Sequence, residues 1–164
     1  MTSFDAIRST VADVDLDAIA SNVEAIRARA KADVIAVVKA DAYGHGAEAV
    51  AQTSFEAGAV MVAVATIEEG LVLREGGVNG PILVLLGPTD SSEVGHAVAL
   101  DLVLVVWDLD RARAISEAAT ALRRDARVHF KVDTGLTRLG APANEAATRY
   151  RAIASLPHLD HDRP

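Results

Sequence analysis

Short apolar runs alternate along the chain with amphipathic stretches, and this alternation is its main structural signal. The first four runs are almost continuously apolar, which is typical of strands buried on both faces of a parallel sheet. The strands predicted in this way are VIAVV (34–38), MVAVA (61–65), PILVLL (81–86), LVLVV (102–106) and RVHFKV (127–132). A further run, TVADVDL (10–16), predicts a short strand outside the main sheet.

The stretches between the runs have the pattern of helices. Thr66 and Glu69 have the spacing of a capping box, which predicts that a helix begins after Thr66. Apolar residues recur at three- and four-residue steps before the first run, at Leu16, Ile19, Val23, Ile26 and Ala30. Two later helices are expected with polar caps, Asp108 before 109–124 and Asn144 before 145–156.

The pattern amounts to about five β/α units. Helices that alternate with parallel strands form either a doubly wound open sheet or part of a (β/α)8 barrel. Such a barrel typically needs about 200–250 residues, and the chain has 164. We therefore expect either an open sheet or an incomplete barrel, with no linker dividing the chain.

Composition narrows the function classes. A formal net charge of −7 disfavours a general nucleic-acid binder, which would carry a basic patch. The absence of cysteine excludes disulfides and thiolate chemistry. No apolar run approaches the roughly 18 residues of a membrane span, and the N-terminus has no secretory h-region. A cytoplasmic protein is expected.

The candidate chemistry lies at the strand ends, where ligands bind in both architectures. Lys39 follows the first run, and Lys131 lies in HFKVDTG with Asp133 and Arg138 after it. A partly buried lysine can act as an amine nucleophile toward a carbonyl. A lysine after a strand is more often simply solvated, however. The histidines lack metal-ligand spacing and no glycine-rich phosphate loop occurs, so neither a metal site nor a common nucleotide fold is predicted.

Two sequence motifs, taken together, indicate a protein family more specifically than any single residue does. AVVKADAYGHG resembles the pyridoxal-phosphate lysine motif of bacterial alanine racemases, and HFKVDTGLTRLG resembles the second signature of that family. The opening STVADVDLDAIASNV is similar to the start of the family. The resemblance covers the chain up to about Leu159. It implies a pyridoxal 5'-phosphate enzyme that interconverts L- and D-alanine, supplies D-alanine for the cell wall and works as a homodimer.

The resemblance also implies roles for individual residues. Lys39 would form the Schiff base with pyridoxal phosphate and act as the base on one face of the substrate Cα. Tyr43 would help to hold the cofactor phosphate, and Arg138 would hydrogen-bond its phenolic oxygen. Lys131, carbamylated in many relatives, would orient that arginine. Supporting roles in loop geometry and hydrogen bonding fall to Asp41, His45 and Asp133. Leu136 and Thr137 depart from the Met-Gly common in the family, which leaves substrate contacts at that turn open.

The family fold is a (β/α)8 barrel followed by a mostly β C-terminal domain, and the chain resembles only the first part. Residues 1–159 are expected to form the N-terminal part of the barrel. Residues 160–164 (DHDRP) do not resemble the family's sixth strand, and His161 is not expected to be its histidine. The tyrosine that serves as the second base in relatives lies in the C-terminal domain. We therefore expect the 164-residue chain by itself to have little or no racemase activity.

Three interpretations remain open. The first is the N-terminal portion of an alanine racemase, or of a racemase of another amino acid. The second is a non-catalytic module that keeps the cofactor lysine without turnover. The third is an open-sheet α/β interaction domain in which Lys39 is an ordinary surface residue.

Overall fold

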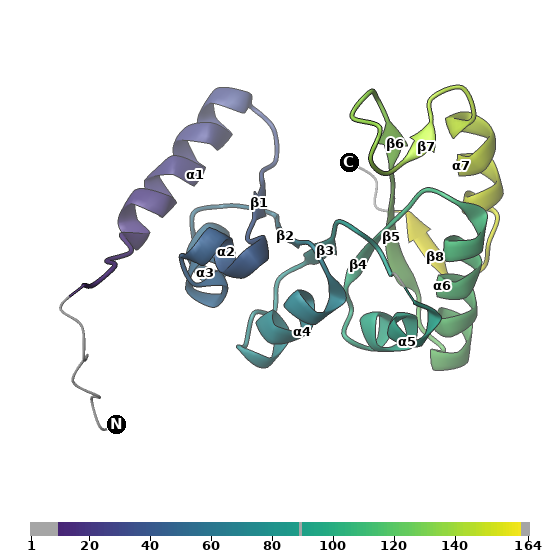
Figure 1. Cartoon of the computed structure of the whole chain (residues 1–164), viewed down its shortest axis with the longest axis horizontal. Coiled ribbons are helices and arrows are strands. Elements are labelled where there is room, and N and C mark those ends of the chain that lie inside the picture. The colour runs from purple at the N-terminus through teal and green to yellow at the C-terminus, as the bar shows by residue number, and fades with distance from the viewer. Residues whose placement is uncertain (1–9, 89, 162–164) are drawn as a thin grey trace.

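A computed structural model describes residues 10–88 and 90–161, and its centre is a curved sheet of six parallel strands (Figure 1). The strands follow one another in chain order across the sheet, β1-β2-β3-β4-β5-β8. Their bounds are β1 Ile35–Val37, β2 Met61–Val64, β3 Ile82–Val84, β4 Val103–Val106, β5 Ala126–Phe130 and β8 Leu159–His161. A two-stranded parallel pair, β6 Val132–Asp133 and β7 Ala141–Pro142, lies beyond β5. The predicted incomplete barrel is thus confirmed.

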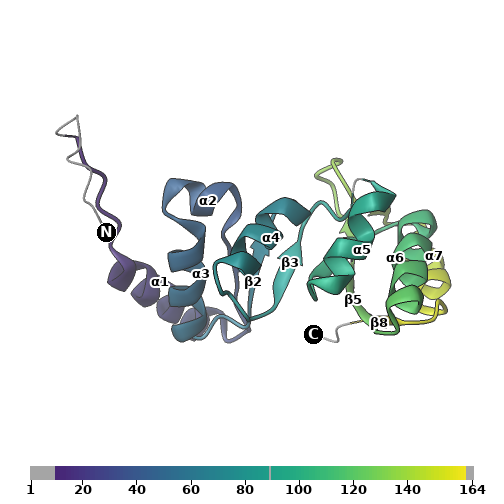
Figure 2. The same ribbon diagram turned by 90° about the horizontal axis from the view of Figure 1, so that it is seen from below.

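The helices follow the strands in the same order along one face of the sheet, as Figures 1 and 2 show. Their bounds are α1 Leu16–Ala30, α2 Lys39–Gly44, α3 Ala47–Glu56, α4 Ile67–Glu75, α5 Ser91–Ala99, α6 Leu109–Leu122 and α7 Ala146–Ala154. The predicted capping box of α4 is present, with the Thr66 hydroxyl accepting from the Glu69 backbone and the Glu69 carboxylate accepting in return. Asp108 caps α6 as predicted, because its Oδ1 accepts from the Arg111 backbone nitrogen at 2.9 Å.

Two local predictions near helix starts are wrong. Residues 10–15 form no strand, and Asp15 instead caps α1, accepting from Ala18 N at 3.0 Å. The short run with Val11 and Val14 suggested a strand, but residues 10–15 are exposed and have no neighbouring strand to pair with in the described structure. Asn144 does not cap α7; the helix begins after Glu145, which has no capping side-chain bond and instead pairs with Arg149.

The C-terminal segment corrects a third expectation. Asp160 and His161 do form a strand, because β8 pairs in parallel with β5, Ala126 opposite Leu159 and Val128 opposite His161. The remaining residues of the DHDRP run, 162–164, lie outside the described residues. Strand β5 is therefore not the edge of the sheet. Backbone N–H and C=O groups need hydrogen-bond partners whatever their side chains are, so β8 can pair with β5 although Asp160 is charged.

The core lies on both faces of the central strands. Val62, Val84 and Leu104 belong to the larger cluster between the sheet and the helices, and all are fully buried. The alternate residues Met61, Leu83 and Val105 pack on the inner face with Trp107 and Ala141. Burial on both faces explains why these runs lack an apolar–polar alternation.

Strand β1 is different, because it is an edge of the sheet. Ile35 and Val37, on the inner face, remain 40% and 43% exposed, whereas Val38 just after the strand is buried. Within residues 10–88 and 90–161, no helix has the length and apolarity that crossing a bilayer would demand.

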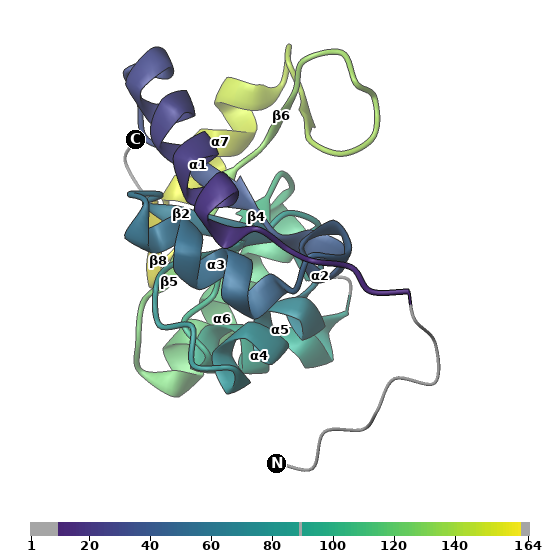
Figure 3. The ribbon, with the colours of Figure 1, turned by 90° about the vertical axis from the view of Figure 1, so that its left-hand side faces the viewer.

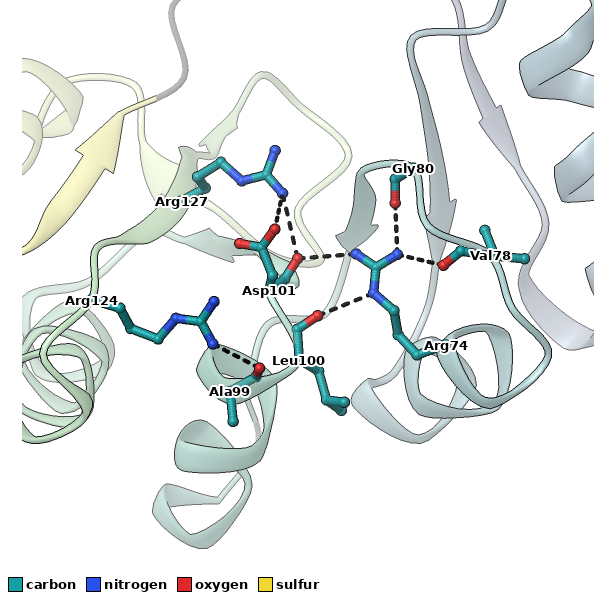
Figure 4. A network of polar contacts seen from close by, with 8 residues as sticks. All are labelled: Arg74, Val78, Gly80, Ala99, Leu100, Asp101, Arg124 and Arg127. Carbon is teal, nitrogen blue, oxygen red and sulfur yellow. Dashed lines mark hydrogen bonds and ion pairs between the residues drawn. The ribbon is translucent and has the colours of Figure 1, made fainter.

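An arginine network holds together the amino ends of the strands, opposite the strand ends that carry Lys39 (Figure 4). Arg74, at the end of α4, donates to the carbonyls of Val78 and Gly80 at 2.6 and 2.7 Å. It also donates to the carbonyls of Leu100 and Asp101 at 3.0 and 3.1 Å. Burial of the guanidinium lowers the Arg74 pKa from its usual value, which Asp101 partly opposes. One side chain thus joins α4 to the turns that precede β3 and β4.

Candidate active site

Lys39 is carried to the carboxyl edge of the sheet by the buried pairing of β1 with β2. The Val38 N–H donates to the Ala63 carbonyl at 2.8 Å, which continues the parallel ladder to the residue before Lys39. Val38 is 1% exposed and Lys39 is half-buried. The apolar run therefore ends with its last valine in the core and its lysine at the rim.

The backbone after Lys39 adopts a left-handed turn. Four consecutive residues from Ala40 to Tyr43 have φ between 50° and 55°, so α2 is not a right-handed helix. Non-glycine residues rarely adopt this conformation, because Cβ approaches the following carbonyl oxygen. Runs of it persist where surrounding contacts determine the backbone, as at functional sites.

Asp41 and His45 hold this turn in place. Asp41 Oδ1 accepts from the Ala47 backbone nitrogen at 2.7 Å, at the start of α3. The His45 Nδ1 lies 2.9 Å from the Ala42 carbonyl oxygen, and the Ala42 N–H donates to the Val38 carbonyl at 2.9 Å. These contacts connect both ends of the turn to the neighbouring backbone, and the supporting roles of Asp41 and His45 in the site stay predictions.

A second segment, from Lys131 to Gly140, reaches the same edge from β5. The Lys131 N–H donates to the Val106 carbonyl at 2.8 Å, and its own carbonyl accepts from Ala141 at 2.9 Å. Gly140 is required where the segment returns, because a Cβ there would lie 2.5 Å from the Asp133 backbone nitrogen. Figure 3 shows the loop between β6 and β7 on the same side of the molecule as α2.

Asp133 organises this loop. Its Oδ1 accepts from the backbone nitrogens of Gly135 and Thr137, each at 3.0 Å. The hydrogen bond from Gly135, followed by that from Thr137, lowers the pKa of the exposed Asp133 carboxyl below its usual value, and the Lys131 charge adds a smaller contribution. Thr137, next to Arg138, has φ 54° and is thus a β-branched residue in the left-handed region.

The two segments meet at a cavity of about 440 Å³. Lys39 lines it together with Lys131, Asp133 and Arg138, so residues from distant parts of the chain share one site. Its other lining residues are Ala65, Leu85, Leu86, Val132, Thr134, Leu136 and Leu139. The Lys39 amine, with two further cationic side chains and several leucines around it, forms a site suited to an anionic carbonyl compound with an apolar body.

Three of the predicted site residues do not line the cavity, namely Asp41, His45 and Tyr43. Of these, Tyr43 is the one expected to help hold the cofactor phosphate. Its side chain is 61% exposed, and the Lys39 Nζ lies 5.8 Å from the centroid of its ring. The other tyrosine, Tyr150, lies in α7 and packs edge-on against Phe130 and His161, with ring centroids 5.6 Å apart in each pair. His161 does not line the cavity.

Sequence reasoning missed part of the site. Ala65 directly follows β2, and Leu85 and Leu86 directly follow β3, so the rule that ligands bind at carboxyl strand ends could have identified them. Glu69 was assigned only to the helix cap, yet its Oε1 also accepts from the Ala40 backbone nitrogen at 2.8 Å. In the described part of the chain, no cluster of three or more His, Asp or Glu side chains could hold a metal ion.

Comparison with known proteins gives a consistent family. The family model described as alanine racemase, N-terminal domain, matches residues 14–162. The alanine racemase of Geobacter sulfurreducens is 41% identical over 88 residues, which are 54% of this chain and 23% of that protein.

Solved structures share the fold as well. An alanine racemase of Clostridium difficile 630 superposes with a TM-score of 0.84 at 34% identity, over 91% of this chain and 42% of that chain. A histidine racemase of Leuconostoc mesenteroides superposes with a TM-score of 0.79 at 29% identity, over 89% of this chain and 40% of that one. The chain therefore spans about two fifths of the length of these structures.

Proposed function

The chain belongs to the alanine racemase N-terminal domain family, and from this membership we propose that it carries the lysine-bearing part of a pyridoxal-phosphate-dependent alanine racemase. The reaction is the interconversion of L- and D-alanine, which supplies D-alanine for the cell wall. The observation that carries the proposal is the common cavity of Lys39, Lys131 and Arg138. We propose a cytoplasmic enzyme that acts on a free amino acid, with no membrane or nucleic-acid partner, and that assembles as a homodimer.

The residues on the cavity wall fit the proposed cofactor. Pyridoxal phosphate is a flat, anionic aldehyde, and the site offers an amine, two further cations and the apolar side chains of Leu85 and Leu139. Lys39 would hold the cofactor covalently through Nζ, and Arg138 would donate to its phenolic oxygen. Tyr43 would contribute to binding of the phosphate from the rim of the site.

The chemistry divides between cofactor and protein. When bound, pyridoxal phosphate provides a sink for the negative charge that develops at the substrate Cα. The ε-amine of Lys39 would remove or return the Cα proton on one face of the substrate. Lys131 would orient Arg138; addition of CO2 to its neutral amine, with loss of a proton, would make it an anionic partner for the guanidinium.

One lysine serves one face only, and racemisation requires a proton donor on the other. Within the described residues, neither tyrosine lines the cavity. We therefore propose that the 164-residue chain tested alone has little or no racemase activity, and that a residue from elsewhere in the assembly completes the site.

The experiment is cofactor trapping. The protein is incubated with pyridoxal phosphate, reduced with borohydride and digested, and the modified lysine is located by mass spectrometry. We expect modification at Lys39, its loss in Lys39→Arg, and its retention in the control Lys31→Arg, which replaces the exposed lysine that ends α1. No adduct at Lys39 would instead support the plain α/β interaction domain.

Deuterium exchange at the substrate Cα then separates the remaining interpretations. Exchange with alanine in deuterated water, in the protein that shows the Lys39 adduct, supports family chemistry. An adduct with no exchange for any amino acid supports the non-catalytic module. Because a histidine racemase shares the fold with a TM-score of 0.79, a racemase of another amino acid is the second candidate. Faster exchange with an amino acid other than alanine would favour it.

A further inference from the structure

Glu69 joins two backbone segments that border the cavity. Its Oε2 accepts from the Ala65 and Thr66 backbone nitrogens at 2.6 and 3.4 Å, directly after β2. Its Oε1 accepts from the Ala40 backbone nitrogen at 2.8 Å, directly after Lys39. One half-buried carboxylate thus bridges the carboxyl ends of β1 and β2.

The position of this bridge matters because the backbone it holds is strained. Ala40 is the first of the four left-handed residues, and its N–H donates to the Glu69 side chain. A charged acceptor makes the stronger class of hydrogen bond. The Cα of Lys39 is therefore fixed between the Val38–Ala63 backbone bond on one side and the Ala40–Glu69 bond on the other.

We propose that Glu69 is a positioning residue that holds the Lys39 backbone so that its side chain enters the cavity. Glu69 does not line the cavity and so acts through Lys39. The inference deepens the proposed function and rests on it for the consequence to cofactor binding, but the effect on the Lys39 segment is measurable without the cofactor.

The rival explanation is that Glu69 only caps α4. The chain offers a matched control for that role, because the Thr66 hydroxyl is the other half of the same capping box but makes no bond to Ala40. Thr66→Ala weakens the cap and leaves the bridge. In Glu69→Gln, a single amide oxygen replaces the two carboxylate oxygens that accept from Ala40 and Ala65. Glu69→Asp keeps the negative charge near the helix start but is one methylene shorter. Both substitutions therefore weaken the bridge.

The first measurement is amide hydrogen exchange at Ala40 in the cofactor-free protein. We expect protection to fall by about tenfold or more in Glu69→Gln and Glu69→Asp, since a hydrogen bond to a charged group is lost. In Thr66→Ala, the protection of the Ala40 amide should stay within about threefold of that in the unsubstituted protein. Equal effects of Glu69 and Thr66 substitutions would overturn the bridge.

The second measurement is acetic anhydride labelling of Lys39, with exposed Lys31 as the internal reference. The ratio of Lys39 to Lys31 labelling should rise in both Glu69 variants and stay unchanged in Thr66→Ala. A ratio that stays constant in all three variants, even with Ala40 deprotected, would overturn the positioning role.

Pyridoxal phosphate titration completes the test. We expect the half-saturating concentration to rise about tenfold in Glu69→Gln and to change less than about twofold in Thr66→Ala. Unchanged binding in Glu69→Gln would refute the positioning role for the cofactor. If the unsubstituted protein forms no Lys39 adduct, the proposed function fails, and the exchange and labelling results still decide whether Glu69 positions Lys39.

Discussion

The left-handed turn after Lys39 predicts an unusual response to glycine. Ala40 has φ 50° and is exposed, so its substitution removes a Cβ from a strained backbone without opening a cavity. Ala49 is also exposed but lies inside the right-handed helix α3. The pair Ala40→Gly and Ala49→Gly therefore makes the same chemical change in two opposite backbone conformations.

The expected magnitudes follow from the two conformations. A left-handed conformation costs an L-residue roughly 1–2 kcal/mol, and glycine avoids this cost. Glycine also gives the unfolded chain more freedom, which costs about 0.4–1 kcal/mol of stability. Ala40→Gly should then raise the free energy of unfolding by about 0–1.6 kcal/mol. Ala49→Gly should lower it by about 1 kcal/mol.

The assay is urea unfolding followed by circular dichroism, with the free energy of unfolding extrapolated for each variant at a common slope. The two variants should therefore differ in free energy of unfolding by roughly 1–2.6 kcal/mol. If Ala40→Gly lowers the free energy of unfolding as much as Ala49→Gly, the turn is not strained and the argument is refuted.

Three further predictions concern the arginine network and the loop between β6 and β7. Arg74→Met should lower the free energy of unfolding by about 3 kcal/mol, because four backbone carbonyls lose a charged donor; exposed Arg151→Met should change it by less than about 0.5 kcal/mol in the same urea assay. Gly140→Ala should displace the loop, since its Cβ would meet the backbone of Asp133 at 2.5 Å, and should abolish borohydride trapping of pyridoxal phosphate while the far-ultraviolet circular dichroism stays unchanged. Because the folded pKa of Asp133 is lowered from 3.8, the loop stability that its carboxylate contributes is present above that value and is lost as pH falls through the folded pKa. Amide exchange at Thr137 should accordingly show less protection in acid, Asp133→Asn should show that lower protection already at neutral pH, and a variant with unaltered protection would contradict this role.

The arrangement around Lys39 shows how far strand-end reasoning reaches. The apolar runs placed Lys39 and Lys131 at carboxyl ends of strands, and the cavity contains both of them. Side-chain burial on both faces of a parallel sheet produces continuous apolar runs, so these strands could be predicted from the order of apolar residues alone. The capping box at Thr66 and Glu69 could be predicted for a similar reason, since its two bonds span only three residues.

Predictions that depended on partners distant in sequence were less successful. Strand β8 carries the charged Asp160 and lacks a strand pattern, yet it forms because β5 presents backbone donors and acceptors beside it. The bond from Glu69 to Ala40 joins residues 29 positions apart, and neither local spacing nor helix propensity contains that information. Tyr43 belongs to the lysine motif, but the left-handed turn directs it to the surface instead of the cavity wall.

The sequence by itself determined the β/α alternation, the parallel sheet, the caps of α4 and α6 and the two segments that carry the candidate chemistry. These features depend on the local period of apolar residues and on bonds between near neighbours. The tertiary structure decided that Lys39, Lys131 and Arg138 share one cavity, that the turn after Lys39 is left-handed and that Glu69 bridges two strands. The physical reason is that side-chain pattern selects each element, whereas backbone groups are satisfied by whichever partner the folded sheet brings within hydrogen-bonding distance.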